Sequence, residues 1–207
     1  ADISGSTDVG GLVGDNDGTI ERAYVSGSLN GTSEVGGIAG DNGGLIEESH
    51  STAAVTGTRR VGGLVGLNND NSTVESSYAA GPVTGESFAG GLIGKQRIYS
   101  SSVTGSYWDT QSTSQSSSAG GTGLTTAQMT GEVARENMPA FDFNKTWRVS
   151  DYYPLLRPVS AESGSLDGVR VDTPSTNVAV GSTVTTPVQI EDVDVGVGAI
   201  ETTITLT

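Results

Sequence analysis

The chain has 207 residues, with 10 basic and 24 acidic side chains and a formal net charge of −14. It contains no cysteine and a single histidine, which excludes disulfide bonds, thiolate metal sites and centres with several histidine ligands. The negative charge disfavours nucleic-acid binding, and no stretch approaches the roughly 20 apolar residues of a transmembrane helix. We therefore expect no nucleic-acid partner and no membrane insertion within this segment.

Glycine supplies 31 residues, about twice its usual share of roughly 7%, whereas aromatic residues make up only 5% of the chain. This composition disfavours a compact helical or doubly wound enzyme. It leaves two alternatives, a partly disordered chain or one built from many tight turns.

A glycine-centred motif recurs in the first half of the chain and favours the second alternative. The copies recur at a nearly constant interval and are Val9–Gly14, Val35–Gly40, Val61–Gly66 and Ala89–Gly94. Because Ile3-Ser4-Gly5 matches the end of a unit, Val55-Thr56-Gly57, we expect the chain to begin partway through a unit with further coils upstream.

Several other positions repeat with the motif. The apolar ones are Leu12, Ile38, Leu64 and Leu92, together with Ile20, Ile46 and Val74, to which we add Ile98 as a fourth member. The polar and aromatic ones are Asn16, Asn42 and Asn68, then Glu21, Glu47 and Glu75, and finally Tyr24, His50 and Tyr78. These columns predict that like side chains lie over like side chains in stacked units.

A unit of about 26 residues with short β-branched runs between Gly, Asn and Asp is typical of one coil of a β-solenoid. Helix is disfavoured, because each glycine inside a helix costs roughly 1 kcal/mol. One coil cannot bury its apolar face alone, but stacked coils can, and stacked asparagines can exchange amide hydrogen bonds. We assign the corners that need positive φ to glycine. The predicted fold class is all-β, with coils over residues 1–110.

The motif resembles the GLUG repeat family, named for a Gly-Leu-x-Gly core that is present at Gly11–Gly14, Gly63–Gly66 and Gly91–Gly94, with Ile38 replacing the leucine in the second copy. The resemblance continues through Tyr107–Thr110, Gly123–Met129 and Phe141–Trp147 to Tyr153–Leu156, and so covers residues 1 to about 157. Such repeats belong to large secreted or surface-anchored bacterial and archaeal proteins, adhesins among them. The resemblance therefore implies an extracellular or cell-surface location.

Residues 111–158 are predicted to close the solenoid, since eight of the eleven aromatic residues fall between Tyr99 and Tyr153. Residues 111–122 are typical of a loop, and 126–137 of a short helix capped by Thr125 and stopped before Pro139. Phe141, Phe143, Trp147 and Tyr153 then plug the open coil end, where unpaired strand edges would otherwise invite aggregation.

The pattern changes after Pro158. Residues 159–168 are typical of a linker, and residues 169–207 alternate as β-strands that share none of the repeat columns. Val178–Val188 looks like the opening of a cohesin-type β-sandwich, but such a sandwich needs about 100 residues. Either the sandwich is cut short, or its missing strands come from another molecule, which predicts self-assembly through unpaired C-terminal strands.

The sequence offers little for catalysis. A serine triad would have to use His50, which we interpret instead as a stacked ring in the column of Tyr24 and Tyr78. Asp15 and Asp41 share a column that Leu67 breaks, and Asp15-Asn16-Asp17-Gly18 fails the spacing of known calcium loops, so it is interpreted as a solvated corner. We expect no catalytic residues, no metal and no cofactor.

Two features suggest an extracellular, salt-rich setting. Asn30, Asn71 and Asn144 each begin an Asn-x-Ser/Thr glycosylation acceptor. The three stacked glutamates should repel one another by just under about 1 kcal/mol per pair in water, and molar salt should relieve this repulsion. With 8 arginines against 2 lysines in an acidic chain, the hypothesis is a protein of a salt-loving organism.

The expected function is an extracellular, non-enzymatic structural or adhesive protein whose solenoid is a spacer that presents a protein-interaction module, in one version within a surface filament. Its partner would be a protein or a glycan at a surface. Two alternatives stay open: a β-helix that binds or degrades polysaccharide, and a cohesin-type module that binds a dockerin-like partner.

Overall fold

The computed structural model describes residues 2–97 and 99–158. The described residues up to Arg157 form one compact unit. The expected linker and the cohesin-like strands, and with them the strand-mediated self-assembly, lie outside the described residues, as does Ile98.

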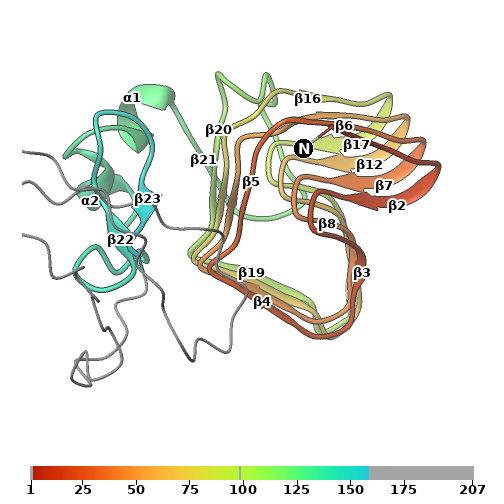
Figure 1. Cartoon of the computed structure of the whole chain (residues 1–207), viewed down its shortest axis with the longest axis horizontal. Helices are drawn as coiled ribbons and strands as arrows, with labels where there is room; N and C mark the ends of the chain where they lie inside the picture. Colours follow the sequence, from red (N-terminus) through yellow and green to blue (C-terminus); the bar gives the residue numbers. More distant parts are fainter. Residues whose placement is uncertain (1, 98, 159–207) are drawn as a thin grey trace, which may run out of the picture. The chain divides into compact units, whose positions relative to one another are not determined.

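This compact unit is a parallel β-solenoid in which each strand from β1 to β15 pairs with the strand five elements later (Figure 1). Five sheets run along the stack. The first contains β1 (Asp2–Ser4), β6 (Ser28–Asn30), β11 (Ala54–Thr56) and β16 (Val83–Thr84). The second contains β2 (Thr7–Gly10), β7 (Ser33–Gly36), β12 (Arg59–Gly62) and β17 (Ser87–Gly90), and the third β3 (Val13–Asn16), β8 (Ala39–Asn42), β13 (Val65–Asn68) and β18 (Ile93–Gln96).

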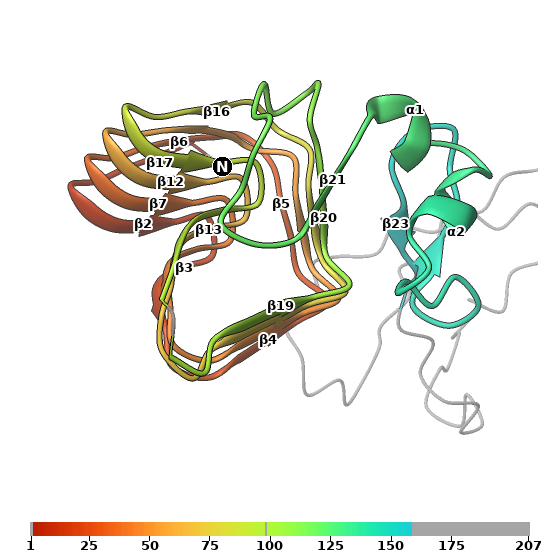
Figure 2. The same ribbon diagram turned by 180° about the vertical axis from the view of Figure 1, so that it is seen from behind.

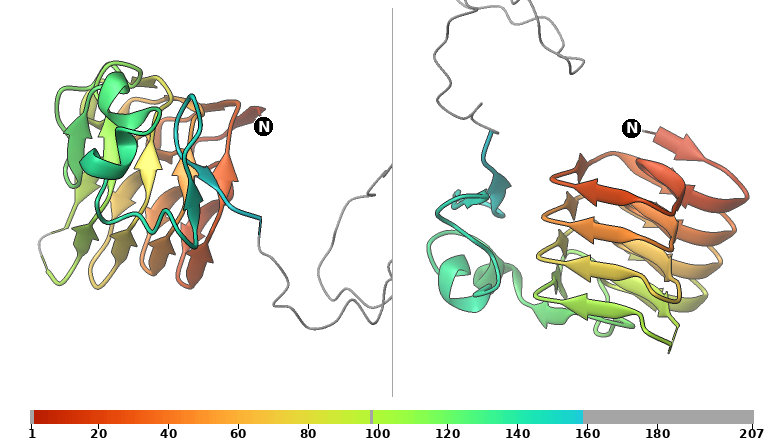
Figure 3. Two further views of the ribbon diagram at one scale, coloured as in Figure 1. Left: turned by 90° about the vertical axis from the view of Figure 1, so that its left-hand side faces the viewer. Right: turned by 90° about the horizontal axis from the view of Figure 1, so that it is seen from below.

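The fourth sheet contains β4 (Thr19–Glu21), β9 (Leu45–Glu47), β14 (Thr73–Glu75) and β19 (Ser102–Thr104). The fifth contains β5 (Tyr24–Val25), β10 (His50–Ser51), β15 (Tyr78–Ala79), β20 (Tyr107–Asp109) and β21 (Thr122–Leu124). About four coils are stacked, as Figures 2 and 3 show from behind and from two sides. The predicted all-β solenoid is confirmed, and equivalent asparagines in its first three coils lie 26 residues apart.

The core is a line of apolar side chains inside the coils. Ile38, Leu64 and Leu92 are fully buried, whereas Leu12 is 53% exposed. Leu12 belongs to the first described coil, so it has a neighbouring coil on one side only. In the second apolar column Val74 pairs with Val103, so the expectation that Ile98 continues this column is wrong.

The glycine motif owes its composition to close packing of the second and third sheets. A Cβ atom on Gly36 would lie 2.0 Å from the carbonyl oxygen of Ala39, and one on Gly66 would lie 2.6 Å from the nitrogen of Val35. The expectation that glycine supplies the positive-φ corners is mostly wrong. Ordinary residues adopt positive φ there, as at Glu34 with φ 50° and Glu48 with φ 46°.

Extra residues enter the coils at one corner, between the third and fourth sheets. Asn42 and Asn68, just before this corner, lie 26 residues apart, whereas Ser49 and Ser77, after it, lie 28 residues apart. Pairing is already restored at Thr73, opposite Leu45, so the added residues lie in the turn at Asn69–Ser72. Thr73 and Ser102 lie 29 residues apart and are paired, so the same corner is longer again in the next coil.

Residues 111–121, here named the end loop, lie across the C-terminal end of the stack. The nitrogen of Gly91 donates to the carbonyl oxygen of Ser117 at 3.1 Å, and the Ser118 hydroxyl accepts from the nitrogen of Ile93 at 2.8 Å. The side chain of Gln115 donates to the carbonyl oxygen of Val83 at 2.9 Å. The loop therefore satisfies backbone groups of the last coil that would otherwise be unpaired.

Residues 125–157, here named the side cap, contain α1 (Thr126–Met129), α2 (Ala134–Asn137) and the hairpin of β22 (Trp147–Arg148) and β23 (Leu155–Leu156). The single helix expected over 126–137 is divided, because Thr130 is extended and Gly131 has φ 66°. Thr125 and Gln128 form the capping box of α1.

The sequence predicts that the aromatic residues of the side cap plug the coil end, and this prediction is wrong. These residues pack instead against Tyr78 and Tyr107 of the fifth sheet. The backbone of the side cap accordingly lies beside the fifth sheet, along the side of the stack (Figure 1). Phe141, Phe143 and Trp147 are buried in a second apolar cluster with Tyr78 and Tyr107. The fifth sheet supplies outward-facing aromatic rings, which the end of the coils does not, and this explains the position of the side cap.

Candidate functional site

The asparagine column is a continuous buried ladder. Asn16 Nδ2 donates to Asn42 Oδ1 at 2.7 Å, and Asn42 Nδ2 donates to Asn68 Oδ1 at 2.9 Å. The next position is Gln96, whose Nε2 donates instead to the carbonyl oxygen of Ser101 at 3.1 Å. The ladder thus couples three coils through side chains in addition to their backbones.

A second polar ladder, which the sequence reasoning missed, consists of buried serines. The nitrogen of Ser49 donates to Ser77 Oγ at 3.0 Å, and the nitrogen of Ser77 donates to Ser106 Oγ at 3.2 Å. Each hydroxyl also donates to the carbonyl oxygen two residues earlier, such as Ser49 Oγ to Glu47 at 2.7 Å. The available signal is a serine two residues after Glu47, Glu75 and Thr104, but the serines are spaced by 28 and then 29 residues, which conceals the repeat until the corner insertions are located.

The aromatic column stacks as rings. His50 lies between Tyr24, at 4.5 Å between ring centroids, and Tyr78, at 4.7 Å. Trp147 of the side cap meets the imidazole edge-on, with centroids 5.6 Å apart. His50 is 3% exposed, and this burial lowers its pKa to about 4, so the ring is neutral at pH 7. Burial also raises the pKa of Tyr78 well above its ordinary value.

Asp109 joins the last coil to the end loop and the side cap. Its buried carboxylate accepts from Thr126 Oγ1 at 2.6 Å, from Tyr153 Oη at 2.5 Å, and from the nitrogen of Gln111 at 2.8 Å. Burial acts to raise the pKa of Asp109, but the hydrogen bonds outweigh it, and the pKa lies below its ordinary value.

A charged network ties the side cap to the first two coils. Arg22 forms a salt bridge with Glu48 at 3.4 Å and donates from Nη2 to the carbonyl oxygen of Arg157 at 2.6 Å. Glu48 also accepts from Thr146 Oγ1 at 2.7 Å. Arg157 in turn donates from Nε to the carbonyl oxygen of Trp147 at 2.9 Å. Together with Asp109, this network holds the side cap to both ends of the fifth sheet.

The glutamate column stacks on the outer face of the fourth sheet. Glu47 pairs in register with Glu21 on one side and Glu75 on the other. Its pKa is raised, first by desolvation and then by repulsion from both neighbours. The salt bridges of the described residues use other glutamates, namely Glu34, Glu48 and Glu132, so this face is a stripe of like charge.

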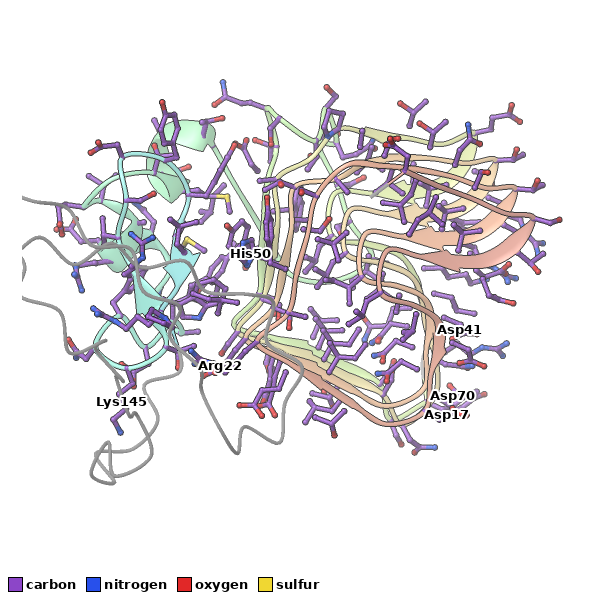
Figure 4. The ribbon with its side chains drawn as sticks, in the orientation of Figure 1. Asp17, Arg22, Asp41, His50, Asp70 and Lys145 are labelled. Carbon is purple, nitrogen blue, oxygen red and sulfur yellow. The ribbon has the colours of Figure 1, made fainter. Side chains whose placement is uncertain are left out.

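Asp41 is the most perturbed carboxyl group among the described residues. Its column contains Asp15 and then Leu67, and its Oδ2 accepts from Asn69 Nδ2 at 3.4 Å. Burial raises the pKa of Asp41 to about 6, and Asp15 and Asp8 add to this effect. In Figure 4, Asp41 lies on the third sheet above the corner that carries Asp17 and Asp70.

Within residues 2–97 and 99–158, no three His, Asp or Glu side chains lie close enough to hold a metal ion, the loop Asp15–Gly18 included. The described part of the chain also contains no helix that is both long and apolar enough to cross a membrane. The neighbours of the His50 ring are aromatic side chains, which is the stacked arrangement expected for its column.

The three glycosylation acceptors are all exposed but differ in their surroundings. Asn30 lies within β6, between two paired strands, whereas Asn71 lies in the enlarged corner. Asn144 lies in the side cap, where the hydroxyl of its partner Thr146 is bonded to Glu48. Whether any of them carries a glycan stays a prediction.

A stretch of 57 residues, 27% of this chain, is 47% identical to halomucin of Haloquadratum walsbyi (strain DSM 16790 / HBSQ001). That stretch corresponds to 1% of the length of halomucin, so the chain spans a very small part of this relative. No family model and no solved structure matches the chain, and the GLUG and cohesin-like resemblances stay predictions.

Proposed function

We propose that this chain is an extracellular, non-enzymatic structural segment whose solenoid is a spacer in a larger surface protein. The observation that carries the proposal is the Asn16–Asn42–Asn68 ladder, which distributes cohesion over successive coils rather than concentrating polar groups in one cleft. The similarity to a protein named halomucin supports a place outside the cell. Adhesion to a surface protein or glycan is the finer version of this proposal.

The spacer is tested by pulling the full chain between its ends. We expect the coils to resist extension and then to open one at a time. A coil of about 26 residues should release about 90 Å, because an extended residue spans roughly 3.4 Å. Smooth extension at low force, without steps, would contradict a mechanical role.

The enzymatic alternative is tested separately, by incubating the chain with acidic and neutral polysaccharides and measuring new reducing ends. We expect none. Release of reducing ends that Glu47→Gln or Asp41→Asn abolishes would replace the spacer with a polysaccharide-degrading β-helix. Saturable binding without cleavage would instead support the adhesive version.

We also propose that the protein works in concentrated salt. The stacked glutamates, the net charge of −14 and the similarity to a protein whose name and genus both refer to salt support this setting. Molar salt shortens the screening length to about 3 Å, less than the roughly 4.8 Å between stacked strands. Unfolding in 3 M and 0.1 M sodium chloride tests the idea, and equal stability in both would contradict it.

Among the glycosylation acceptors we favour Asn71, since it is exposed at an irregular corner rather than within a paired strand. Intact mass of the chain from a glycosylating host should exceed the mass of the polypeptide. The excess should disappear in Asn71→Gln and persist in Asn144→Gln.

A further inference from the structure

The contact between the fifth sheet and the side cap contains a buried ionisable ring. His50 is 3% exposed and Trp147 is fully buried, and Figure 4 shows His50 facing the side cap. His50 Nδ1 and Trp147 Nε1 are both buried, and neither has a hydrogen-bond partner among the described residues. A neutral imidazole tolerates this environment, whereas an imidazolium there would be a buried charge without a counter-ion.

The surroundings offer no compensation for a positive ring. Tyr24 and Tyr78, above and below it, are neutral in acid, and Tyr153 of the side cap, which stacks near Tyr78, hydrogen-bonds to Asp109. The charged groups on the neighbouring corner and on the hairpin of the side cap are Arg22, Glu48, Arg148, Asp151 and Arg157, of which Asp151 is exposed to solvent. Glu48 already binds Arg22 and Thr146, and no salt bridge within the described residues includes His50.

We propose that His50 is an acid-sensitive latch: protonation of its ring releases the side cap from the fifth sheet while the coils stay folded. The ring lies outside the coil core, which consists of aliphatic side chains such as Ile46 and Val55 together with Trp108. Release of the side cap therefore separates Phe141 and Trp147 from Tyr78 and Tyr107 of the fifth sheet. The hydrogen-bonded ladders between coils stay in place.

Acid acts on the coils in the opposite direction. Asp41 and Glu47 both have raised pKa values in the folded state, so they take up protons more readily when folded than when unfolded. Their contribution to stability is greatest at low pH and is lost as pH rises. Acidification thus strengthens the stack while it weakens the attachment of the side cap. The released state would expose aromatic surface on an intact solenoid.

Hydrogen exchange of the full chain, resolved by peptide and corrected for intrinsic rates, tests the latch at pH 6.5, 5 and 4. The ordinary pKa of histidine is 6.5 and that of buried His50 is about 4. Linkage between these values raises the undocking equilibrium constant by about a hundredfold across this range. We expect peptides of residues 138–157 to lose protection by that factor, while peptides of β7 to β15 keep theirs.

The decisive variant is His50→Phe, which keeps an aromatic ring in the column but cannot be protonated. Its side cap should stay protected down to pH 4. If that chain fails to fold, His50→Tyr places in the second coil the residue found at Tyr24 and Tyr78. Tyr24→Phe is the matched control, because it alters the same column and leaves the acid response intact. The latch would be overturned if the side cap of His50→Phe lost as much protection in acid as that of the unaltered chain. It would also be overturned if the coils and the side cap of the unaltered chain lost protection together.

Discussion

Asn42 donates a hydrogen bond of 2.9 Å from Nδ2 to Oδ1 of Asn68, one coil further along the solenoid. Asn42 also accepts from Asn16, so it is the middle member of the ladder and is fully buried. Each coil therefore depends on its neighbours for the satisfaction of a buried amide.

Replacement of this middle residue should cost more than replacement of the end one. Asn42→Ala leaves the amide of Asn16 and the carbonyl of Asn68 without their ladder partner, for a loss of about 3 kcal/mol. Asn16→Ala deprives only Asn42 and should cost about 1 kcal/mol. Urea unfolding of both variants measures the difference, and equal losses would show that the ladder does not act as a unit.

The glycine motif should tolerate no side chain where the second and third sheets meet. In Gly36→Ala the new Cβ would lie 2.0 Å from the carbonyl oxygen of Ala39, so the strands must separate. We expect either no folding or a loss of about 3 kcal/mol or more, as for severe overpacking. The control is Gly18→Ala, whose Cβ would come no nearer than 4.0 Å to Asn16 Oδ1. Thermal unfolding should separate the two variants clearly.

Asp41 should make the coils less stable as the pH rises. Its pKa is about 6 in the folded state against 3.8 ordinarily, so the folded chain holds more protons between these values and stability falls as pH rises from 3.8 to 6. Asp41→Asn should remove this slope while its side-chain oxygen still accepts from Asn69. Urea midpoints at pH 4, 5 and 6 measure the slope, and an unchanged slope in the variant would assign it to another carboxyl group.

Glu47 should account for part of the salt dependence. Glu47→Gln removes the middle charge of three, and with it two repulsive pairs, so it should stabilise the chain in dilute buffer at pH 7 by up to about 2 kcal/mol. The gain should vanish in molar salt, because screening already suppresses the repulsion. Glu132→Gln, in the exposed pair with Arg135, is the control and should show no such gain. Denaturation at two salt concentrations decides the matter.

Asp109 should stabilise the junction of the last coil and the side cap as long as its carboxyl group is ionised. Asp109→Asn replaces one acceptor oxygen by a donor that faces Thr126 and Tyr153, for a loss of about 2 kcal/mol. Because the folded pKa is depressed, the contribution is complete above the ordinary value of 3.8 and is lost as pH falls through the folded pKa. Thermal unfolding at pH 7 and pH 3 should therefore show a difference that shrinks in acid.

The coils could be predicted from the sequence because similar side chains recur at a nearly constant spacing. Asn16, Asn42 and Asn68 define the register by themselves, and Val35 and Val61 repeat it in the next sheet. Once the register of the stacked strands is known, the hydrogen bonds between equivalent residues of neighbouring coils follow from it. The apolar columns can then be assigned to the core of the solenoid.

The position of the side cap could not be predicted, because it occurs once and has no column to align. Trp147 and Phe141 indicate that the side cap contains a buried cluster. The surface that this cluster covers is set by its contacts with the outward-facing rings of His50 and Tyr78. The anchoring role of Asp109 depends on Tyr153, which is distant in the sequence, and no local pattern relates the two. The end loop is predictable as a loop, yet the backbone groups that it satisfies lie on another segment.

The corner at Asn69–Ser72 shows where this architecture accepts change. Coils of different length remain in register on both sides of it, because the added residues lie in the turn and leave the paired strands untouched. Residues can therefore be inserted at this corner, by mutation, by duplication or by grafting of a foreign peptide, without a change in the strand pairing of the solenoid. An array of such coils would evolve by changes in the length and sequence of this turn, while the buried columns of the coils stayed constant.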